Sequence, residues 1–207
     1  MATPKGVEAT ALQDAAKLRC TLAADLHAHP AQSQARPYLV VLSGLPGTGK
    51  SHFARELVKR LPFIIVGSDR SRKALVSRPK YTKGEHARVF AACHLLIEQL
   101  LGEGHGIIFD ATNLTEHFRQ PLYEMAERTR AILLVVWFTA SREVVRRRLD
   151  DRANGRSEDN YSDADWLVYC RLRPGEEIIT RPHLVVDSSE DICPALEEVV
   201  RRISGHE

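Results

Sequence analysis

Short apolar runs alternate along the chain with longer segments in which apolar residues recur every three or four positions. Each run is five to eight residues long, which is typical of a strand buried on both faces of a parallel sheet. The pattern therefore predicts five parallel strands. They are Tyr38–Ser43, Phe63–Gly67, Gly106–Asp110, Ala131–Phe138 and His183–Asp187.

The segments between and after these runs have the apolar spacing of amphipathic helices. Alternation of such strands and helices indicates a parallel sheet with helices on both faces. We therefore expect a three-layer α/β/α fold built on a five-stranded parallel sheet. The predicted helices are Lys50–Arg60, Glu85–Leu101, Glu116–Thr129, Arg142–Asp151, Asp163–Arg173 and Glu190–Ile203.

Residues 1–37 have a different pattern from the rest of the chain. The segment Ala9–Ala28 is alanine-rich and carries an apolar stripe, which predicts an amphipathic helix, and a polar, proline-bounded linker follows it up to residue 37. The stripe must cover the main domain, which we favour, a second copy of the chain in a homodimer, or a domain lost from a longer ancestor. We expect a helix and linker over 1–37 and one domain over 38–207. The stripe residues are Leu12, Ala15, Leu18, Leu22 and Leu26.

Composition narrows the class of protein. The 207 residues include 43% hydrophobic and 27% charged residues, which is the composition of a globular domain. The net charge of +2 excludes a strongly basic nucleic-acid protein but leaves room for a local basic site. The apolar runs are far shorter than the ~20 residues of a membrane helix. Four dispersed cysteines without a CxxC pair are typical of free thiols in a reducing cytoplasm, so we expect a cytoplasmic protein.

The strongest motif is Gly44–Ser51, which follows the first predicted strand and opens a helix. It fits GxxxxGK[ST], in which glycines let backbone N–H groups point at phosphate oxygens. Lys50 would supply a cation to the β- and γ-phosphates, and the hydroxyl of Ser51 would bind Mg²⁺. The motif predicts binding of ATP or a similar triphosphate with Mg²⁺. The expected nucleotide-binding residues are Gly44, Gly47, Thr48, Gly49, Lys50, Ser51 and His52.

Three classes of protein use such a loop: kinases, mechanical ATPases and GTPase switches. The chain has no NKxD motif for guanine, which argues against a GTPase. The third strand ends in Asp110 followed by Ala111, whereas a hydrolytic ATPase normally has an acidic base directly after that aspartate. An enzyme that transfers phosphate to a substrate benefits from lacking a residue that activates water. The pattern therefore favours a kinase.

Asp69 and Arg72 follow the second strand, on the side where an acceptor is expected. Ligands of parallel sheets gather beyond the carboxyl ends of the strands. A carboxylate there can orient an acceptor hydroxyl and take its proton, while the planar fork of an arginine suits a phosphate or carboxylate. The alternative for Asp69 is a helix cap.

The third strand delivers Asp110, Thr112 and Asn113 to the same edge. Asp110 is a natural outer carboxylate for the Mg²⁺ that Ser51 would bind. Thr112 and Asn113 would hydrogen-bond the acceptor or the loop backbone. The alternative is that the Thr-Asn pair caps a helix before Glu116.

Arginines are densest over residues 141–156, and a polar, glycine-containing stretch follows them. Arg148 and Arg152 are four residues apart and share one helical face. We expect at least one of them to contact the transferring phosphate from a mobile lid over about 142–162. The alternative is a solvated helix face. Ser162 is the expected N-cap of the next helix.

Taken together, these residues resemble a group of P-loop kinases labelled AAA-family ATP-binding proteins, which are related to polynucleotide 5′-kinases and zeta toxin-like kinases. The resemblance covers roughly residues 38–203 and implies a nucleoside-monophosphate-kinase-like fold. The elements that carry it are Gly44–Ser51, Ser68-Asp69-x-x-Arg72, Asp110-x-Thr112-Asn113-Leu114, the arginine-rich segment and Ser162-Asp163-Ala164-Asp165.

The resemblance also implies roles for individual residues. Asp69 would be the general base and Arg72 would bind a phosphate on the acceptor side. The lid arginine maps onto Arg148 or Arg152. We therefore expect a kinase that phosphorylates a hydroxyl group, with a small molecule as acceptor. A polynucleotide 5′-hydroxyl end and a non-transferring ATP-binding or hydrolysing regulatory module are the alternatives, because the segment Val76–His94 shows no pattern diagnostic of an acceptor.

Overall fold

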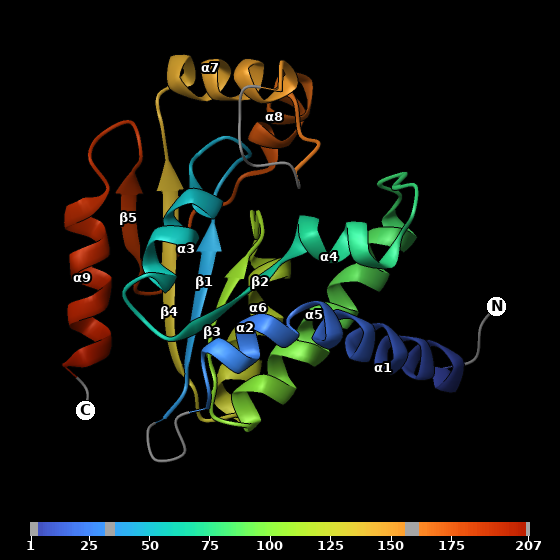
Figure 1. Cartoon of the computed structure of the whole chain (residues 1–207). Helices are drawn as coiled ribbons and strands as arrows, with labels where there is room; N and C mark the ends of the chain where they lie inside the picture. Colours follow the sequence, from blue (N-terminus) through green and yellow to red (C-terminus); the bar gives the residue numbers. More distant parts are fainter. Residues whose placement is uncertain (1–3, 32–35, 156–161, 206–207) are drawn as a thin grey trace.

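The computed structural model describes residues 4–31, 36–155 and 162–205 (Figure 1). Its five strands form one parallel sheet in the order β2-β3-β1-β4-β5, which confirms the predicted sheet. The first three strands have the predicted bounds, and the last two begin one residue later. The strands are β1 (Tyr38–Ser43), β2 (Phe63–Gly67), β3 (Gly106–Asp110), β4 (Ile132–Thr139) and β5 (Leu184–Asp187).

Helices cover both faces of the sheet, so the three-layer fold is confirmed. On one face, α3 (Lys50–Val58) and α9 (Cys193–Ser204) pack against alternate strand residues such as Val40. On the other face, α5 (Lys83–Gly102) and α6 (Glu116–Arg128) pack against the residues between them, such as Leu39. This alternation follows from the two-residue period of a strand. The remaining helices are α1 (Pro4–Thr21), α2 (Ala23–Ala28), α4 (Ser68–Leu75), α7 (Arg142–Ala153), α8 (Trp166–Leu172) and the short 3₁₀ turn Arg173–Gly175.

Two helices begin three residues later than predicted, one at Cys193 instead of Glu190 and the other at Trp166 instead of Asp163. The helix expected from Asp163 begins at Trp166, because the side chain of Asp165 accepts the backbone N–H of Val168 at 2.8 Å. Asp165 is therefore the N-cap and the expectation that Ser162 fills this position is wrong. Serine and aspartate cap helices about equally well, so the sequence offered two equivalent starts three residues apart.

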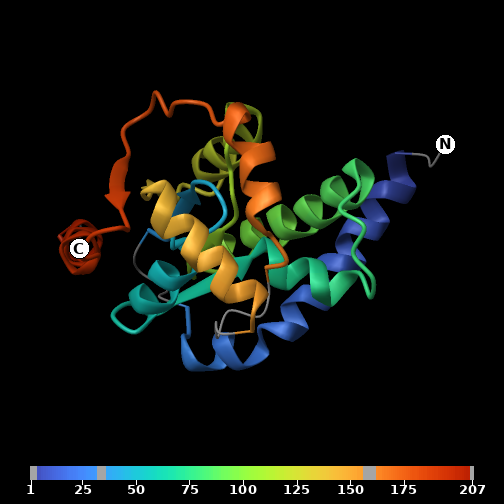
Figure 2. The ribbon, with the colours of Figure 1, turned by 90° about the horizontal axis from the view of Figure 1, so that it is seen from above.

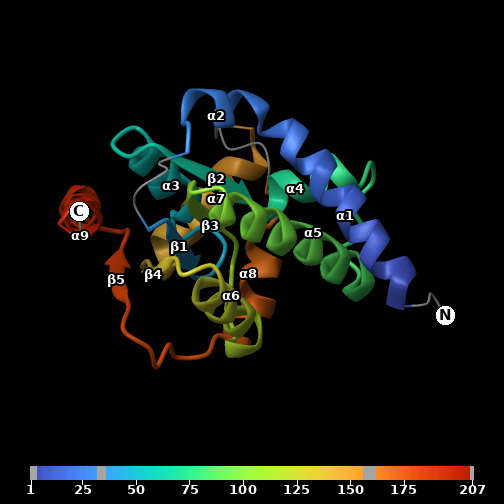
Figure 3. The same ribbon diagram turned by 90° about the horizontal axis from the view of Figure 1, so that it is seen from below.

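The N-terminal helix α1 lies along α5 (Figures 1 and 3). The buried side chains of Ala15 and Leu18 in α1, and of Leu22 directly after it, join the core between α5 and the sheet, so the apolar stripe covers the main domain, the alternative we favoured. Leu12, expected in the same stripe, is 49% exposed. Two ion pairs hold the helix in place. Asp14 accepts from Arg88 at 2.6 and 2.9 Å, and Arg19 donates to Glu103 twice at 2.8 Å.

Helix α7 lies over the carboxyl ends of the strands and crosses the middle of the molecule when seen from above (Figures 1 and 2). Its buried residues Val145 and Leu149 form a separate apolar cluster with Leu45, Leu114 and Tyr169. Because Leu45 belongs to the glycine-rich loop, this cluster fixes α7 directly above that loop.

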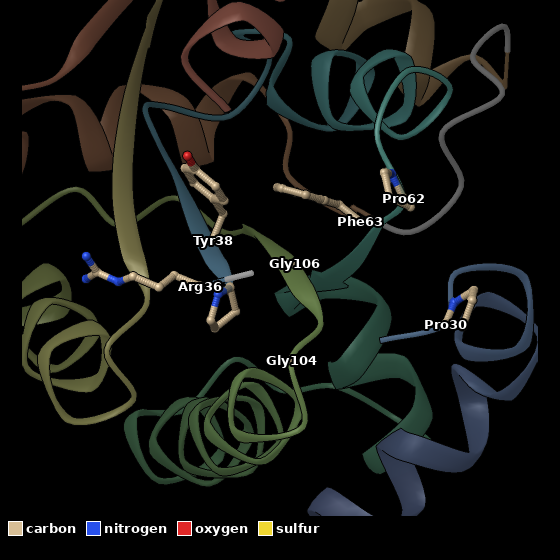
Figure 4. Close-up of a pocket in the computed structure, with 8 residues that line it drawn as sticks. Pro30, Arg36, Tyr38, Pro62, Phe63, Gly104 and Gly106 are labelled. Atoms are coloured by element: carbon tan, nitrogen blue, oxygen red, sulfur yellow. The ribbon is translucent and has the colours of Figure 1, made fainter. Parts of the chain in front are cut away.

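The opposite, amino ends of the strands carry a hollow lined by Tyr38, Phe63 and Gly106, among others (Figure 4). The ring of Phe63 lies over Gly106, where an added Cβ would be 2.4 Å from a ring carbon. Only glycine allows this close approach. Since ligands of parallel sheets bind beyond the carboxyl ends, the candidate site lies at the other end.

Candidate functional site

Strand register brings the predicted site residues to one edge of the sheet. Asp110 at the end of β3 lies level with Leu42 of β1 and with Gly67 of β2. The chain leaves β1 into the loop Gly44–Ser51 and leaves β2 into α4, which carries Asp69. Three segments far apart in sequence thus start from the same edge, as the sequence predicted.

The loop Gly44–Ser51 has the backbone of a phosphate-binding loop. Gly44, Gly47 and Gly49 have φ angles of 142°, 81° and 86°, which favour glycine. A Cβ on Gly44 would lie 2.6 Å from the carbonyl oxygen of Phe138, so no larger residue fits there. The N–H of Gly44 donates to the carbonyl of Thr112 at 2.9 Å and ties the loop to the end of β3.

Lys50 begins α3 and turns its side chain back into the loop. Its Nζ donates to the carbonyl oxygens of Gly44 at 2.8 Å and Leu45 at 2.9 Å, and the residue is 8% exposed. Burial lowers the pKa of Lys50, while the charges of Asp110 and Asp69 raise it. Within the described residues its hydrogen-bond partners are neutral carbonyls, so the charge is held at the loop without an ion pair.

The other residues predicted to bind the nucleotide differ in their exposure and contacts. The hydroxyl of Thr48 donates within the loop, to the carbonyl of Leu45 at 2.8 Å. Ser51 is half-buried in the first turn of α3, whereas His52 is exposed. Helix N-termini favour anions, so the backbone around Ser51 is suited to phosphate.

Ser51 and Asp110 fit the predicted metal site. Both carry oxygen atoms of the kind that Mg²⁺ prefers as ligands, and both lie at the same edge of the sheet. Across the described ranges, no cluster of three or more His, Cys, Asp or Glu residues has metal-binding geometry.

The two arginines that share a face of α7 differ in their contacts. Arg148 donates to the carbonyl of Ser188 at 2.7 Å, to its hydroxyl at 2.8 Å and to the carbonyl of Gly47 at 3.3 Å. The hydroxyl of Ser188 in turn donates to the carbonyl of Thr48 at 2.8 Å. Burial lowers the pKa of Arg148. Arg148 therefore braces the loop from outside through Ser188.

Arg152 lies one turn further along α7 and has an unsatisfied donor. Its Nε is buried and has no hydrogen-bond partner in the described part of the chain. Burial is the main cause of the lowered pKa of Lys50, and the positive charge of Arg152 lowers it further. Of the two candidates, Arg152 is the one with a donor left for a phosphate.

Asp69 lies in the first turn of α4 and is half-buried. The N-cap position is Gly67 and no side chain caps this helix, so the interpretation of Asp69 as a cap is wrong. Burial is the main cause of the raised pKa of Tyr81, and the charge of Asp69 raises it further; the same charge opposes the burial that lowers the pKa of Lys50. Among the residues that the structure describes, no ion pair engages it.

Arg72 is 4% exposed and is paired internally. Its Nη1 donates to Glu85 at 2.6 Å and its guanidinium carbon lies 4.8 Å from the centre of the Tyr81 ring. Glu85 also accepts the N–H groups of Lys80 at 2.8 Å and Tyr81 at 3.3 Å. Arg72 thus ties α4 to the start of α5 across the intervening loop.

Asn113 lies beneath the glycine-rich loop, with φ of 44° and 1% exposure. Its Nδ2 donates to the carbonyl of Leu42 at 2.8 Å. The N-cap of α6 is Thr115, so the alternative that Thr112 and Asn113 cap this helix is wrong. Arg119 is fully buried and donates to the carbonyl of Asn113 at 3.0 Å, so it faces neither the site nor solvent.

The arginine-rich segment is only partly described, since residues 156–161, including Arg156, lie outside the described residues. Arg142 and Arg146 each stack on Trp166 at 5.3 Å. Asp163 accepts from the hydroxyl of Tyr81 at 2.6 Å and pairs with Lys73 at 3.0 Å. The lid over 142–162 stays a prediction, with α7 as its described part.

Sequence reasoning missed Ser188 and Tyr81. Ser188 directly follows the last predicted strand, so the rule that ligands gather beyond strand ends could have identified it. Tyr81 has a φ of 53° in a loop between helices, and no sequence signal marked it. Both residues act by connecting segments that are distant in the chain.

Comparison with known families identifies the chain. The AAA domain family matches residues 39–169, well over half of the sequence. The chain belongs to the AAA domain family. The match includes the glycine-rich loop, Asp69, Asp110 and α7. In the described part of this AAA domain protein, we find no helix both long and apolar enough to cross a membrane.

Several solved structures share the fold, among them two kinases and a nucleotide-bound protein. The adenylyl-sulfate (APS) kinase CysC of Mycobacterium tuberculosis, in complex with AMPPNP and APS, is 16% identical with a TM-score of 0.63, covering 82% of this chain and 98% of its own. Kti12 of Chaetomium thermophilum, in complex with ADP-AlF3, is 22% identical with a TM-score of 0.65, covering 81% and 97%. A gluconokinase of Sinorhizobium meliloti is 17% identical with a TM-score of 0.58, covering 84% and 97%. These similarities show that the chain shares the fold of these proteins.

Proposed function

We propose that this protein is an ATP- and Mg²⁺-dependent kinase that transfers the γ-phosphoryl group to a hydroxyl group of a small molecule. The observation that carries the proposal is the arrangement at one sheet edge. A phosphate-type loop holds Lys50 on neutral carbonyls, and Asp69, in the first turn of α4 at the same sheet edge, has no ion pair among the described residues.

The loop Gly44–Ser51 would hold the triphosphate, with His52 next to it on α3. Lys50 and Arg152 would stabilise the negative charge of the transferring group, while Arg148 keeps the loop in place. Ser51 and Asp110 would hold Mg²⁺, which neutralises phosphate charge when bound. Thr112 and Asn113 support the floor of this site through the loop backbone.

In the transfer step, the acceptor hydroxyl oxygen forms a bond to the γ-phosphorus while the bond between that phosphorus and the leaving oxygen of ADP breaks. Asp69 orients the hydroxyl and receives its proton. The products are the phosphate ester and ADP. Since Ala111 follows Asp110, the position that commonly activates water in hydrolytic ATPases is apolar. That feature supports transfer over hydrolysis.

The test is the variant Asp69→Asn, measured by ADP release with a panel of nucleosides, oligonucleotides, sugars and aminoglycosides. We expect transfer to the best acceptor to fall by roughly 10²–10⁴-fold, since general-base catalysis contributes about that much. Affinity for AMPPNP should stay within about twofold. The control is Glu124→Gln, which changes an exposed carboxylate on α6 and should leave transfer unchanged.

Two outcomes would contradict the proposal. One is undiminished transfer by a folded Asp69→Asn variant. The other is steady ATP turnover that needs no acceptor and is unaffected by this substitution, which would favour a hydrolytic module. Preferential transfer of labelled phosphate to 5′-hydroxyl oligonucleotides would instead identify a polynucleotide kinase.

A further inference from the structure

All three cationic residues of α4 are paired with carboxylates from other segments. Helix α4 begins at the edge of the sheet where the acceptor is expected, and Asp69 lies in its first turn. An acceptor that carries a phosphate or carboxylate needs a cation to bind it. The pairs are Arg70 with Asp25 at 3.3 Å, Arg72 with Glu85 at 2.6 Å and Lys73 with Asp163 at 3.0 Å.

The Arg72–Glu85 pair is the most buried of the three. Its side chains are 5% and 11% exposed. Glu85 is also held by the backbone N–H groups of Lys80 and Tyr81. The hydrogen bond from the Lys80 N–H group lowers the pKa of Glu85, and the hydrogen bond from Arg72 lowers it further. This carboxylate therefore stays ionised. The charge of Arg72 is therefore neutralised from within the protein through Nη1, while its buried Nε has no partner among the described residues.

An anionic acceptor group would have to separate this pair before it could bind Arg72. Removing one partner of a buried ion pair leaves an uncompensated charge, which is strongly destabilising. The incoming anion would also meet the negative charges of Glu85 and Asp69 in a partly desolvated space. A neutral hydroxyl compound avoids both costs.

We propose that Glu85 is a specificity-determining residue, which occupies Arg72 and selects an acceptor that carries no phosphate or carboxylate at this position. This inference rests on the proposed kinase function, because it concerns the acceptor side of the same site. It reverses the role that the resemblance implied for Arg72. The class of acceptor is an uncharged hydroxyl compound.

The direct test is anion binding and requires no acceptor. The full-length protein is saturated with AMPPNP and Mg²⁺ to fill the loop, and inorganic phosphate is titrated by calorimetry. We expect no Arg72-dependent phosphate binding by the unmodified protein up to about 10 mM. Glu85→Gln should bind phosphate at least about tenfold more tightly, and Glu85→Gln/Arg72→Gln should lose this gain. Glu103→Gln, which releases Arg19 from its own pair on the surface, is the matched control and should show no gain.

Phosphate binding by the unmodified protein that Arg72→Gln abolishes would overturn the inference, and so would a folded Glu85→Gln variant without any gain. If Glu85→Gln does not fold, matched acceptors replace it: thymidine against thymidine 3′-monophosphate, and glucose against gluconate. The neutral member should have at least about tenfold higher kcat/KM, and equal or better use of the anionic member would overturn the inference. Because the phosphate titration involves no transfer, its result is independent of the Asp69 test.

Discussion

The nucleotide side and the acceptor side of the site use positive charge in opposite ways. On the nucleotide side, Lys50 and Arg148 donate to neutral backbone carbonyls, and Arg152 keeps a buried Nε without a partner among the described residues. On the acceptor side, the cations of α4 are bound to carboxylates, although Arg72 also keeps a buried Nε without a partner there. A cation that is hydrogen-bonded only to neutral groups still attracts an anion. A cation that is paired with a carboxylate has its charge neutralised and serves to hold the structure together. The two sides differ in the groups to which their cations are hydrogen-bonded, and the net charge of +2 does not reveal this.

The largest expected effect tests the nucleotide side. Arg152→Gln should reduce phosphoryl transfer by roughly 10²–10³-fold, about 3–4 kcal/mol, because it removes a donor that we expect to act on the transferring phosphate. The measurement is kcat with a verified acceptor. Arg146→Gln, on the exposed side of the same helix, should change kcat by less than about twofold. Equal losses in the two variants would remove the distinction between the arginines of α7.

The next effect tests how the acceptor side is supported. Leu18→Ala removes a buried side chain of α1 from the core around α5 and should lower the free energy of unfolding by about 2–5 kcal/mol. Urea denaturation followed by circular dichroism measures this. Leu12→Ala, at an exposed position of the same helix, should cost less than about 0.5 kcal/mol. A harmless Leu18→Ala would mean that α1 does not support α5.

A third prediction concerns pH and His94 on α5. Burial lowers the pKa of His94 to about 4 in the folded protein, against 6.5 for the ordinary side chain. Between these values the unfolded chain binds the proton more readily, so stability falls as pH decreases from about 6.5 to 4 and levels off below. The contribution is on the order of 3 kcal/mol. Unfolding curves at several pH values should show this slope, and a folded His94→Leu variant should flatten it.

The smallest expected effect distinguishes support of the glycine-rich loop by Arg148 from a direct role in phosphoryl transfer. Arg148→Gln should raise the KM for ATP by roughly tenfold, about 1.4 kcal/mol, with kcat changed little, because Arg148 holds the loop through Ser188. The neighbouring Arg147 is exposed, and Arg147→Gln should leave both constants unchanged. A loss confined to kcat would place Arg148 among the groups that act on the transition state.

Local patterns were sufficient for much of the fold. Strands β1, β2 and β3 were predicted to the residue, since each is a continuous apolar run with a polar or glycine boundary. The glycine-rich loop was equally clear, because its motif requires a strand before it and a helix after it, and both are present. These features depend on neighbours in the chain.

Pairings between distant residues could not be predicted. Arg72 and Glu85 are thirteen positions apart across a loop, and Ser188 contacts Thr48 from 140 positions away. Its position after the second strand placed Arg72 at the correct edge of the sheet, but neither helix α4 nor the carboxylate partner of Arg72 was predicted. The burial of Arg119 was equally invisible, because apart from the nearby carboxylate of Glu116 its acceptors are backbone carbonyls, which every sequence offers at every position.

The packing of α1 on α5 affects which fragments of the protein would remain free of aggregation. A fragment that starts at Tyr38 keeps the whole glycine-rich loop and every candidate catalytic residue. Such a fragment would nevertheless expose the apolar surface of α5 that Ala15, Leu18 and Leu22 cover, and exposed apolar patches promote aggregation. A fragment that contains every candidate catalytic residue is therefore shorter than the shortest fragment that we expect to resist aggregation.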